Sequence, residues 1–225
     1  MLKTAGPLHF FAASPDREDA LGGTTEKKTS RIQMRNRGRI LDAALDVFSQ
    51  HGYRGATLDQ IAESAGLSKP NILYYFEGKE EIHITLLNQL METWLDPLVT
   101  LDPAGDPLDE ILNYVHRKLD MAHEFPRESR LFAGEILQGA PRMAPHLQAG
   151  LQPLFDEKCA VIEAWMDAGH LTRVDPRHLI FSIWATTQHY ADFAAQVQVL
   201  LRDDPASQSG AQEYLTALFT RLLKP

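Results

Sequence analysis

A short polar stretch near residue 70 carries side chains that are well suited to reading a nucleic acid. Ser68, Lys69, Pro70 and Asn71 follow one another there. Ser68 suits the N-cap of a helix, and Pro70 suits the first turn, where its missing N–H costs nothing. Short polar and basic groups at such a helix start can reach base edges and phosphates in a DNA groove. The stretch predicts the leading edge of a recognition helix.

Four flanking residues are candidates for contacts to the phosphate backbone. Tyr74 and Tyr75 can direct hydroxyl groups at phosphate oxygens, and Lys79 begins the next helix, where free amides already favour an anion. Thr57 could act in the same way from the start of the preceding helix. Two alternatives remain open, since Thr57 can serve only as a helix cap and one tyrosine can belong to the core.

Two short helices must position these side chains. The first spans residues 57–65 and begins with Thr57 followed three residues later by Gln60, the spacing of a capping box. Gly66 allows a tight reversal before the second helix, which closes near Phe76. This is the layout of a helix-turn-helix, although short helix pairs with a glycine turn also occur in proteins that bind no DNA.

The rest of the chain has helical periodicity. An earlier helix runs from residue 32 to a glycine cap at Gly52, and a long amphipathic one begins at Lys79, extends through Trp94 and stops at Pro97. No stretch alternates at period two, so the prediction is an all-helical fold. Further helices are expected at 107–124, 126–138, 146–168, 176–201 and 208–223. The expected organisation is a mobile tail over 1–30, a DNA-binding domain over 31–78 and a helical ligand-binding and dimerisation domain over 79–225.

Charge is distributed unevenly along the chain. The formal net charge is −8, yet residues 27–79 carry nine basic and five acidic side chains. Residues 80–225 carry eleven basic and twenty-one acidic ones. A basic block joined to an acidic body is the pattern of a nucleic-acid reader with a separate sensing or assembly part. A basic arm beside ordinary solvated faces would give the same counts.

Several classes of protein are disfavoured by the sequence. It has no run of 18 apolar residues, which argues against a membrane protein, and its single Cys159 cannot form an internal disulfide and suits the cytoplasm. His189, Asp192 and His178 lack the Glu-x-x-His pairs of helical metal sites. No phosphate loop, nucleophile elbow or catalytic triad is present. We therefore expect no catalytic residues, no metal and no cofactor.

The spacing of residues around the two short helices resembles the amino-terminal domain of TetR-family repressors. One departure is Leu73, which stands where many members carry a tyrosine, and it favours Tyr74 as a phosphate contact. The resemblance implies a cytoplasmic homodimer that binds double-stranded operator DNA and releases it when a small molecule binds the helical body. The segments that carry it are Ala43–Phe48, Gly52-Tyr53, Thr57–Ala62, Ala65–Lys69 and Leu73–Glu81.

Four segments of the body are distinctive: Trp94–Leu98, Ser129–Phe132, Asp175–Phe181 and Ile183–Gln196. Together they resemble one branch of that family, the regulators of pyrimidine utilisation. That resemblance implies an effector such as uracil or thymine and control of pyrimidine catabolism. A repressor of the same family that senses a different small metabolite remains the alternative.

Gln188 is the centre of the expected effector site. It lies four residues after Trp184 and four before Asp192, so the three share one helical face. A buried amide offers a donor and an acceptor, which complement the edge of a pyrimidine ring against an aromatic wall from Trp94 or Trp184. Alternatively, Gln188 bonds to a neighbouring helix and the tryptophans are core. Since the middle helices usually line the pocket in this family, further candidates are Lys118, Phe132 and Glu135.

The segment over 176–201 is apolar on more than one side. A helix of that kind faces its own core on one side and a partner on the other. With the amphipathic segment over 208–223 it would form a four-helix dimer interface. The competing interpretation is a central helix in a monomeric bundle.

Overall fold

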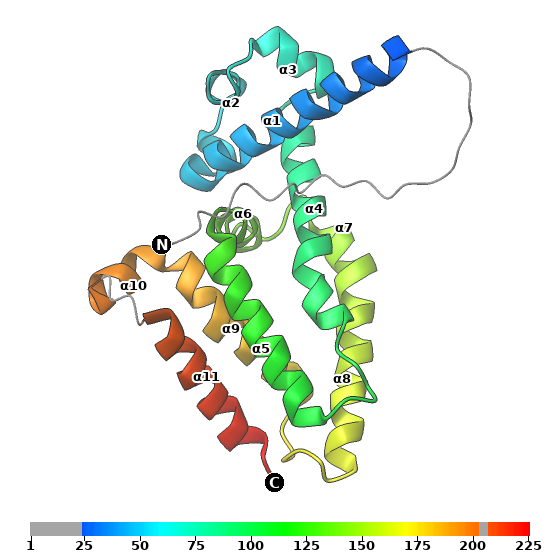
Figure 1. The fold of residues 1–225 in the computed structure, drawn as a ribbon, viewed down its shortest axis with the longest axis vertical. Helices are drawn as coiled ribbons and strands as arrows, with labels where there is room; N and C mark the ends of the chain where they lie inside the picture. Colours follow the sequence, from blue (N-terminus) through cyan, green and yellow to red (C-terminus); the bar gives the residue numbers. More distant parts are fainter. Residues whose placement is uncertain (1–23, 203–206) are drawn as a thin grey trace.

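The protein, described by a computed structural model over residues 24–202 and 207–225, consists of a small helical head on a long helical body (Figure 1). The head contains α1 (Thr24–Gly55), α2 (Leu58–Ala65) and α3 (Lys69–Tyr75). Helix α4 (Lys79–Val99) descends from the head into the body. The body continues with α5 (Pro107–Glu124), α6 (Pro126–Leu137), α7 (Ala144–His146), a π-helical turn η1 (Leu147–Leu151), α8 (Gln152–Asp167), α9 (Pro176–Asp192), α10 (Ala194–Leu201) and α11 (Ser207–Leu223). The described residues contain no strand, which confirms the all-helical prediction.

Local sequence rules account for the geometry of the head. Thr57 and Gln60 form the expected capping box at the start of α2. Gly66 adopts a left-handed conformation with φ 61°, which turns the chain into α3. Ser68 caps α3 as expected, since its hydroxyl accepts a hydrogen bond from the backbone N–H of Asn71 at 3.4 Å. Apolar residues of all three helices are buried together, including Ile40, Phe48, Ile61, Ile72 and Phe76.

Several helix boundaries differ from the prediction. Residues 24–30, expected in the tail, belong to α1, whereas residues 1–23 lie outside the described residues. Pro97 does not stop α4, because it lies in the last turn and costs a single backbone hydrogen bond before the helix ends at Val99. The helix expected over 176–201 is broken at Phe193, whose φ and ψ of −111° and 28° are not helical. Gly52 does end the regular part of α1, with φ 65°.

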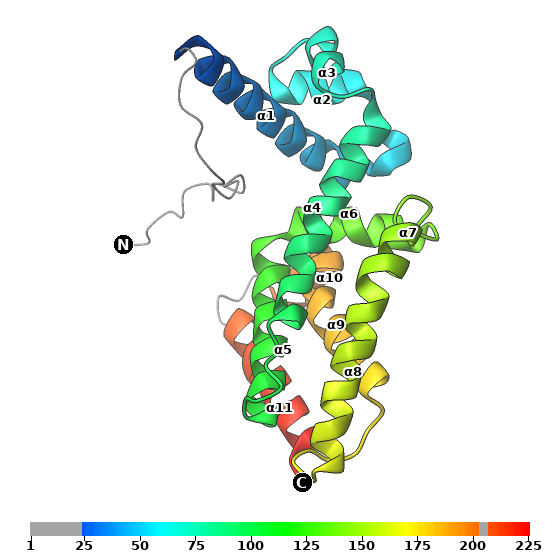
Figure 2. The ribbon, with the colours of Figure 1, turned by 90° about the vertical axis from the view of Figure 1, so that its right-hand side faces the viewer.

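Helix α5 occupies the middle of the body, where it packs against both α9 and α11 (Figures 1 and 2). One apolar cluster joins α5, α8, α9 and α11. Another joins the head to α4, α6 and the turn that follows α6, through Leu131, Ala140 and Met143. Head and body therefore share a core at their junction. No helix among the described residues is long and apolar enough to cross a bilayer.

His83 should make the protein sensitive to acid. Its imidazole is buried at the junction, with ring centroids 4.8 Å from Phe48 and 4.9 Å from Tyr53, and burial lowers its pKa to about 4. Between pH 6.5 and 4 the unfolded chain therefore binds more protons at this residue than the folded one. We expect the free energy of unfolding to fall by about 1–3 kcal/mol through that window.

Urea unfolding at pH 7 and pH 4.5 measures this effect. His83→Gln should lose most of the pH dependence, whereas His51→Gln, at an exposed site, should keep it. Equal pH dependence in the wild type and His83→Gln would contradict the assignment.

Candidate functional site

The leading edge of α3 is exposed. Ser68, Lys69, Pro70 and Asn71 all face solvent, while Ile72 is fully buried and anchors the helix to the head. The Lys69 ammonium lies 3.0 Å from a carboxylate oxygen of Asp59 on α2. Such an exposed pair is weak and can give way to a phosphate. The structure thus brings together the four residues expected to lead a recognition helix.

The two tyrosines at the end of α3 differ in their surroundings. Tyr74 is 70% exposed, and its hydroxyl accepts a hydrogen bond from the Gln33 amide at 3.3 Å. Tyr75 is half-buried, and its hydroxyl accepts from the Asn36 amide at 3.0 Å. A groove of about 360 Å³ between α1 and α3 is lined by Gln33, Met34, Arg37, Tyr74 and Tyr75. Tyr74 has the greater freedom to reach a phosphate.

Lys79 and Thr57 are engaged inside the head. The Lys79 ammonium donates hydrogen bonds to the backbone oxygens of Tyr53 and Ala56, each at 2.8 Å. The Thr57 hydroxyl donates to the Gln60 side chain at 2.9 Å and accepts from the Gln60 N–H at 3.2 Å. Both residues therefore stabilise the ends of neighbouring helices, and the alternative noted for Thr57, a cap, is the role seen in the structure.

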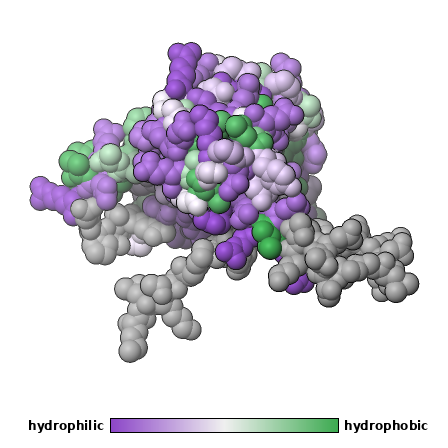
Figure 3. Space-filling model, turned by 90° about the horizontal axis from the view of Figure 1, so that it is seen from above, coloured by the Kyte–Doolittle hydropathy of each residue, from purple (hydrophilic) through white to green (hydrophobic). Residues whose placement is uncertain are grey.

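The head presents a largely hydrophilic surface. Seen from above, hydrophilic side chains cover most of it and apolar ones form small patches (Figure 3). The basic balance of residues 27–79 belongs to this part of the molecule. A polar, basic surface around an exposed helix start is what backbone and base contacts to DNA require.

A separate aromatic cluster lies in the body between the two larger cores. It contains Leu90 and Trp94 of α4 and Met121 of α5, with Phe125 and Phe132 packed against them. The Lys118 ammonium lies 5.1 Å from the centroid of the Trp94 ring. Trp94, Lys118 and Phe132, three of the six residues expected to bind a ligand, therefore lie together.

Two hydrogen-bond donors in this cluster lack partners. Lys118 is only 3% exposed, yet its ammonium makes no hydrogen bond or ion pair to any other described residue. Burial lowers its pKa to about 7. The indole N–H of Trp94 is also buried without a hydrogen-bond partner. Because unpaired buried donors are costly, they mark a place where a ligand could supply acceptors.

Two contacts pair α5 with α9 on either side of Gln188. The Trp184 indole N–H donates to the Tyr114 hydroxyl at 2.6 Å, and the rings of Tyr190 and His123 lie 5.9 Å apart. Gln188 lies between Trp184 and Tyr190 along α9, and its side chain is half-buried. One turn further along α9, the Asp192 carboxylate accepts a hydrogen bond from the Ser129 hydroxyl of α6 at 2.5 Å.

Glu135 and Trp184, two further candidates for the ligand site, have hydrogen-bond partners of their own. Glu135 is buried but accepts hydrogen bonds from the Arg142 backbone N–H at 2.7 Å and guanidinium at 3.0 Å. Trp184 bonds to Tyr114 and packs against Phe155 and Phe181. Sequence reasoning missed Ser129, although its position three residues before Phe132 puts both on one face of α6.

A helix-turn-helix head on a helical body is the architecture of a DNA-binding transcriptional regulator. Two family models match the chain: "Bacterial regulatory proteins, tetR family" over residues 40–84 and "YcdC-like protein, C-terminal region" over residues 87–225. The chain belongs to the TetR family of transcriptional regulators. Its homologues are regulators rather than enzymes.

Full-length relatives support this assignment. The transcriptional regulator RutR of Escherichia coli K12 is 47% identical over 184 residues, which cover 80% of this chain and 87% of RutR. The repressor SCO4008 of Streptomyces coelicolor is 26% identical, over 83% of this chain and 94% of its own. The solved structure of the ketosteroid regulator KstR2 of Mycobacterium tuberculosis shares the fold, with a TM-score of 0.63 at 16% identity, over 84% of this chain and 95% of that one.

Proposed function

We propose that this regulator is a dimeric repressor that binds a pseudo-palindromic operator and is released from it by uracil or thymine, and that it controls pyrimidine catabolism. The observation that carries the effector proposal is the Trp94 indole N–H, a buried donor without a partner, beside the buried Lys118 side chain, whose ammonium lies over the Trp94 ring. The 47% identity to RutR over most of the chain supports it.

The polar groups of the cluster complement the edge of a uracil ring. Uracil and thymine present two carbonyl oxygens and two N–H groups. Lys118 and Trp94 can donate to the oxygens, while the Gln188 amide can both donate and accept. The Asp192 carboxylate oxygen that is not bonded to Ser129 can accept a hydrogen bond from a ring N–H. Cytosine carries an amino group where uracil carries a carbonyl. Its amino N–H donors would therefore face the donors of the protein instead of supplying an acceptor.

The aromatic side chains suit the faces of such a ring. Trp94 of α4, Phe132 of α6 and Phe125 at the junction of α5 and α6 belong to the cluster. Small-molecule sites typically combine walls of this kind with a few fixed polar groups. A different metabolite is the second candidate, favoured by one observation: a buried ammonium without a counter-charge would also suit a small carboxylic acid.

The dimer is proposed to form through α9, α10 and α11. Phe181 of α9 and the stripe of Tyr214, Leu218 and Leu222 on α11 are exposed in the single chain. Exposed apolar surface of this extent marks an interface, and a two-fold axis would use the same patch on both copies. Two α3 helices could then enter successive major grooves about 34 Å apart.

Helix α4 connects the two proposed sites. Its first residue, Lys79, donates a hydrogen bond to the end of α1. Trp94, in the last turns of α4, belongs to the aromatic cluster that we propose as the effector site. A ligand that displaces Trp94 would tilt α4 and change the spacing of the two heads. DNA is released only if the effector binds more tightly to the protein when the heads have a spacing that does not fit the operator. The same coupling must weaken effector binding when DNA is bound.

Operator binding with and without uracil tests the proposal. A DNA site selected from a random pool would be labelled, and its affinity for the purified protein measured by fluorescence anisotropy. We expect saturating uracil or thymine to weaken binding at least tenfold and cytosine to have no effect. A selected site whose affinity is the same with all three bases would contradict the assignment of the effector.

Lys69 should contribute to DNA binding but not to effector binding. Lys69→Ala removes a cation from the leading edge of α3, so we expect operator affinity to fall about fivefold to tenfold. The slope of log affinity against log salt concentration should decrease by about one unit, which corresponds to one phosphate contact. Uracil affinity should not change. Lys224→Ala, which removes the same charge at the far end of the body, is the control. An unchanged salt dependence in Lys69→Ala would remove this residue from the interface.

A further inference from the structure

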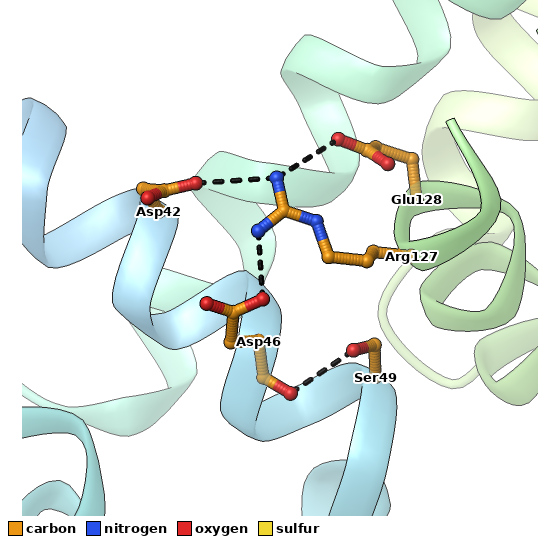
Figure 4. Close-up of polar contacts among 5 residues, drawn as sticks. All are labelled: Asp42, Asp46, Ser49, Arg127 and Glu128. Carbon is orange, nitrogen blue, oxygen red and sulfur yellow. Dashed lines mark hydrogen bonds and ion pairs between the residues drawn. The ribbon is translucent and has the colours of Figure 1, made fainter. Parts of the chain in front are cut away.

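An arginine at the start of α6 joins the body to the head. The Arg127 guanidinium contacts α1 through Asp46 at 2.7 Å and Asp42 at 3.2 Å, and Glu128 of its own helix lies 3.8 Å away (Figure 4). Asp42 and Asp46 are one helical turn apart, so the guanidinium spans a turn of α1. The contact fixes the position of α6 relative to the helix that supports α2 and α3.

The same helix reaches the proposed effector site. Ser129, two residues after Arg127, donates its hydroxyl hydrogen bond to Asp192 of α9. Phe132, five residues after Arg127, packs against the cluster of Leu90, Trp94 and Met121. Helix α6 is a short helix of 12 residues and moves as a rigid unit. A displacement of Ser129 or Phe132 therefore moves Arg127 as well.

The turn after α6 makes a second contact with the head. Arg142 bonds to the buried carboxylate of Glu135, and its guanidinium lies 3.5 Å from the centroid of the Tyr53 ring. It also lies 3.6 Å from a carboxylate oxygen of Glu80, near the start of α4. Both ends of α6 are therefore attached to elements that carry the DNA-binding helices.

We propose that Arg127 is a positioning residue through which α6 transmits occupancy of the effector site to α1. This inference rests on the proposed function, because it requires an effector that binds beside Phe132. It adds a second connection to the one that α4 provides. Arg127 contacts neither the proposed ligand nor DNA, so its loss should change the coupling between the two sites more than either affinity alone.

The carboxylates that Arg127 contacts make it suitable for mutation. The side chains of Asp42 and Asp46 are 67% and 39% exposed, and that of Glu128 is 18% exposed, so removing the arginine leaves no fully buried carboxylate behind. Partly exposed ion pairs contribute little to folding stability. Arg127→Gln should therefore fold, and Asp46→Asn breaks the shorter contact from the other side.

The test is a binding cycle on the full-length protein. Operator affinity is measured without and with uracil, and uracil affinity is measured without and with the selected DNA site. The coupling factor is the ratio of the two affinities in each pair, and both pairs must give the same value. In Arg127→Gln we expect the coupling factor to fall about threefold to tenfold, while each affinity measured alone changes less than about threefold. Arg127→Lys should recover part of the coupling. Arg117→Gln removes a guanidinium from the outside of the body, 3.9 Å from Asp96, and should leave the coupling unchanged.

The possible results separate the two proposals. An Arg127→Gln protein with the coupling factor of the wild type would overturn the role of Arg127, even if both affinities were lower. A reduced factor in Asp46→Asn, with no further loss in the double variant, would support it. If the wild type itself bound uracil and DNA independently, the proposed function would fail, and this inference with it.

Discussion

Replacing Lys118 by methionine should weaken uracil binding about tenfold to hundredfold. The expected loss corresponds to one hydrogen bond from a charged donor, worth about 1.5–3 kcal/mol. Methionine is unbranched like lysine and only slightly shorter, and it removes a buried ammonium that has no counter-charge. The variant should therefore be at least as stable as the wild type. Titration calorimetry and thermal unfolding measure the two effects.

The pH dependence of the same titration tests the protonation state of Lys118. Burial lowers its pKa to about 7 in the free protein, and a carbonyl acceptor would raise that pKa in the complex. Uracil binding should then take up a proton above pH 7, and affinity should fall by up to about tenfold for each pH unit above it. Below pH 7 affinity should be constant. Lys118→Met should show no such slope.

Lys158 provides a matched control. It is also a buried lysine, but it lies on α8, where its ammonium donates to the backbone oxygen of Leu101 at 3.3 Å. Lys158→Met should leave uracil affinity and its pH dependence unchanged. Wild-type affinity in Lys118→Met would show that the ammonium does not face the ligand.

A charge in the exposed apolar stripe of α11 should separate the proposed dimer. Leu218 lies between Tyr214 and Leu222, one turn from each, and all three are exposed in the single chain. Leu218→Asp would place a carboxylate at the centre of the proposed interface, where it lacks a partner. We expect dissociation at micromolar concentration and at least a tenfold loss of operator affinity, because a monomer contacts only one half-site. Sedimentation velocity and anisotropy measure these outcomes.

Gln212→Asp adds the same charge on a different side of α11. Gln212 lines a groove along α11 together with Ser209, Glu213, Thr216 and Arg221. This variant should remain a dimer. A Leu218→Asp protein that sediments as a dimer at low micromolar concentration would show that the interface lies on another face.

The head could be predicted from the sequence because local rules determine it. The caps at Thr57 and Ser68 and the left-handed Gly66 follow from side-chain chemistry and backbone sterics within a few residues. Pro97 and Phe193 show the limits of such rules. A proline in the last turn is tolerated, and the break at Phe193 interrupts an apolar stretch whose sequence contains neither glycine nor proline.

The effector cluster was only partly predictable, because its members come from distant parts of the chain. The spacing of Gln188 and Asp192 on one helix was visible in the sequence. Glu135 and Trp184 lie on α6 and α9, the helices of Phe132 and Gln188. The Glu135 carboxylate bonds to Arg142, and the Trp184 indole N–H bonds to Tyr114. That choice of partner depends on how α6 packs on the head and α9 on α5, which residue spacing does not reveal.

The central claim is that the body recognises a pyrimidine with two ring carbonyls. Isothermal titration of the full-length protein with uracil, thymine and cytosine tests it most directly. We predict micromolar binding of uracil and thymine, with no heat from cytosine. Absence of heat with all three bases, or equal affinity for cytosine, would contradict the claim.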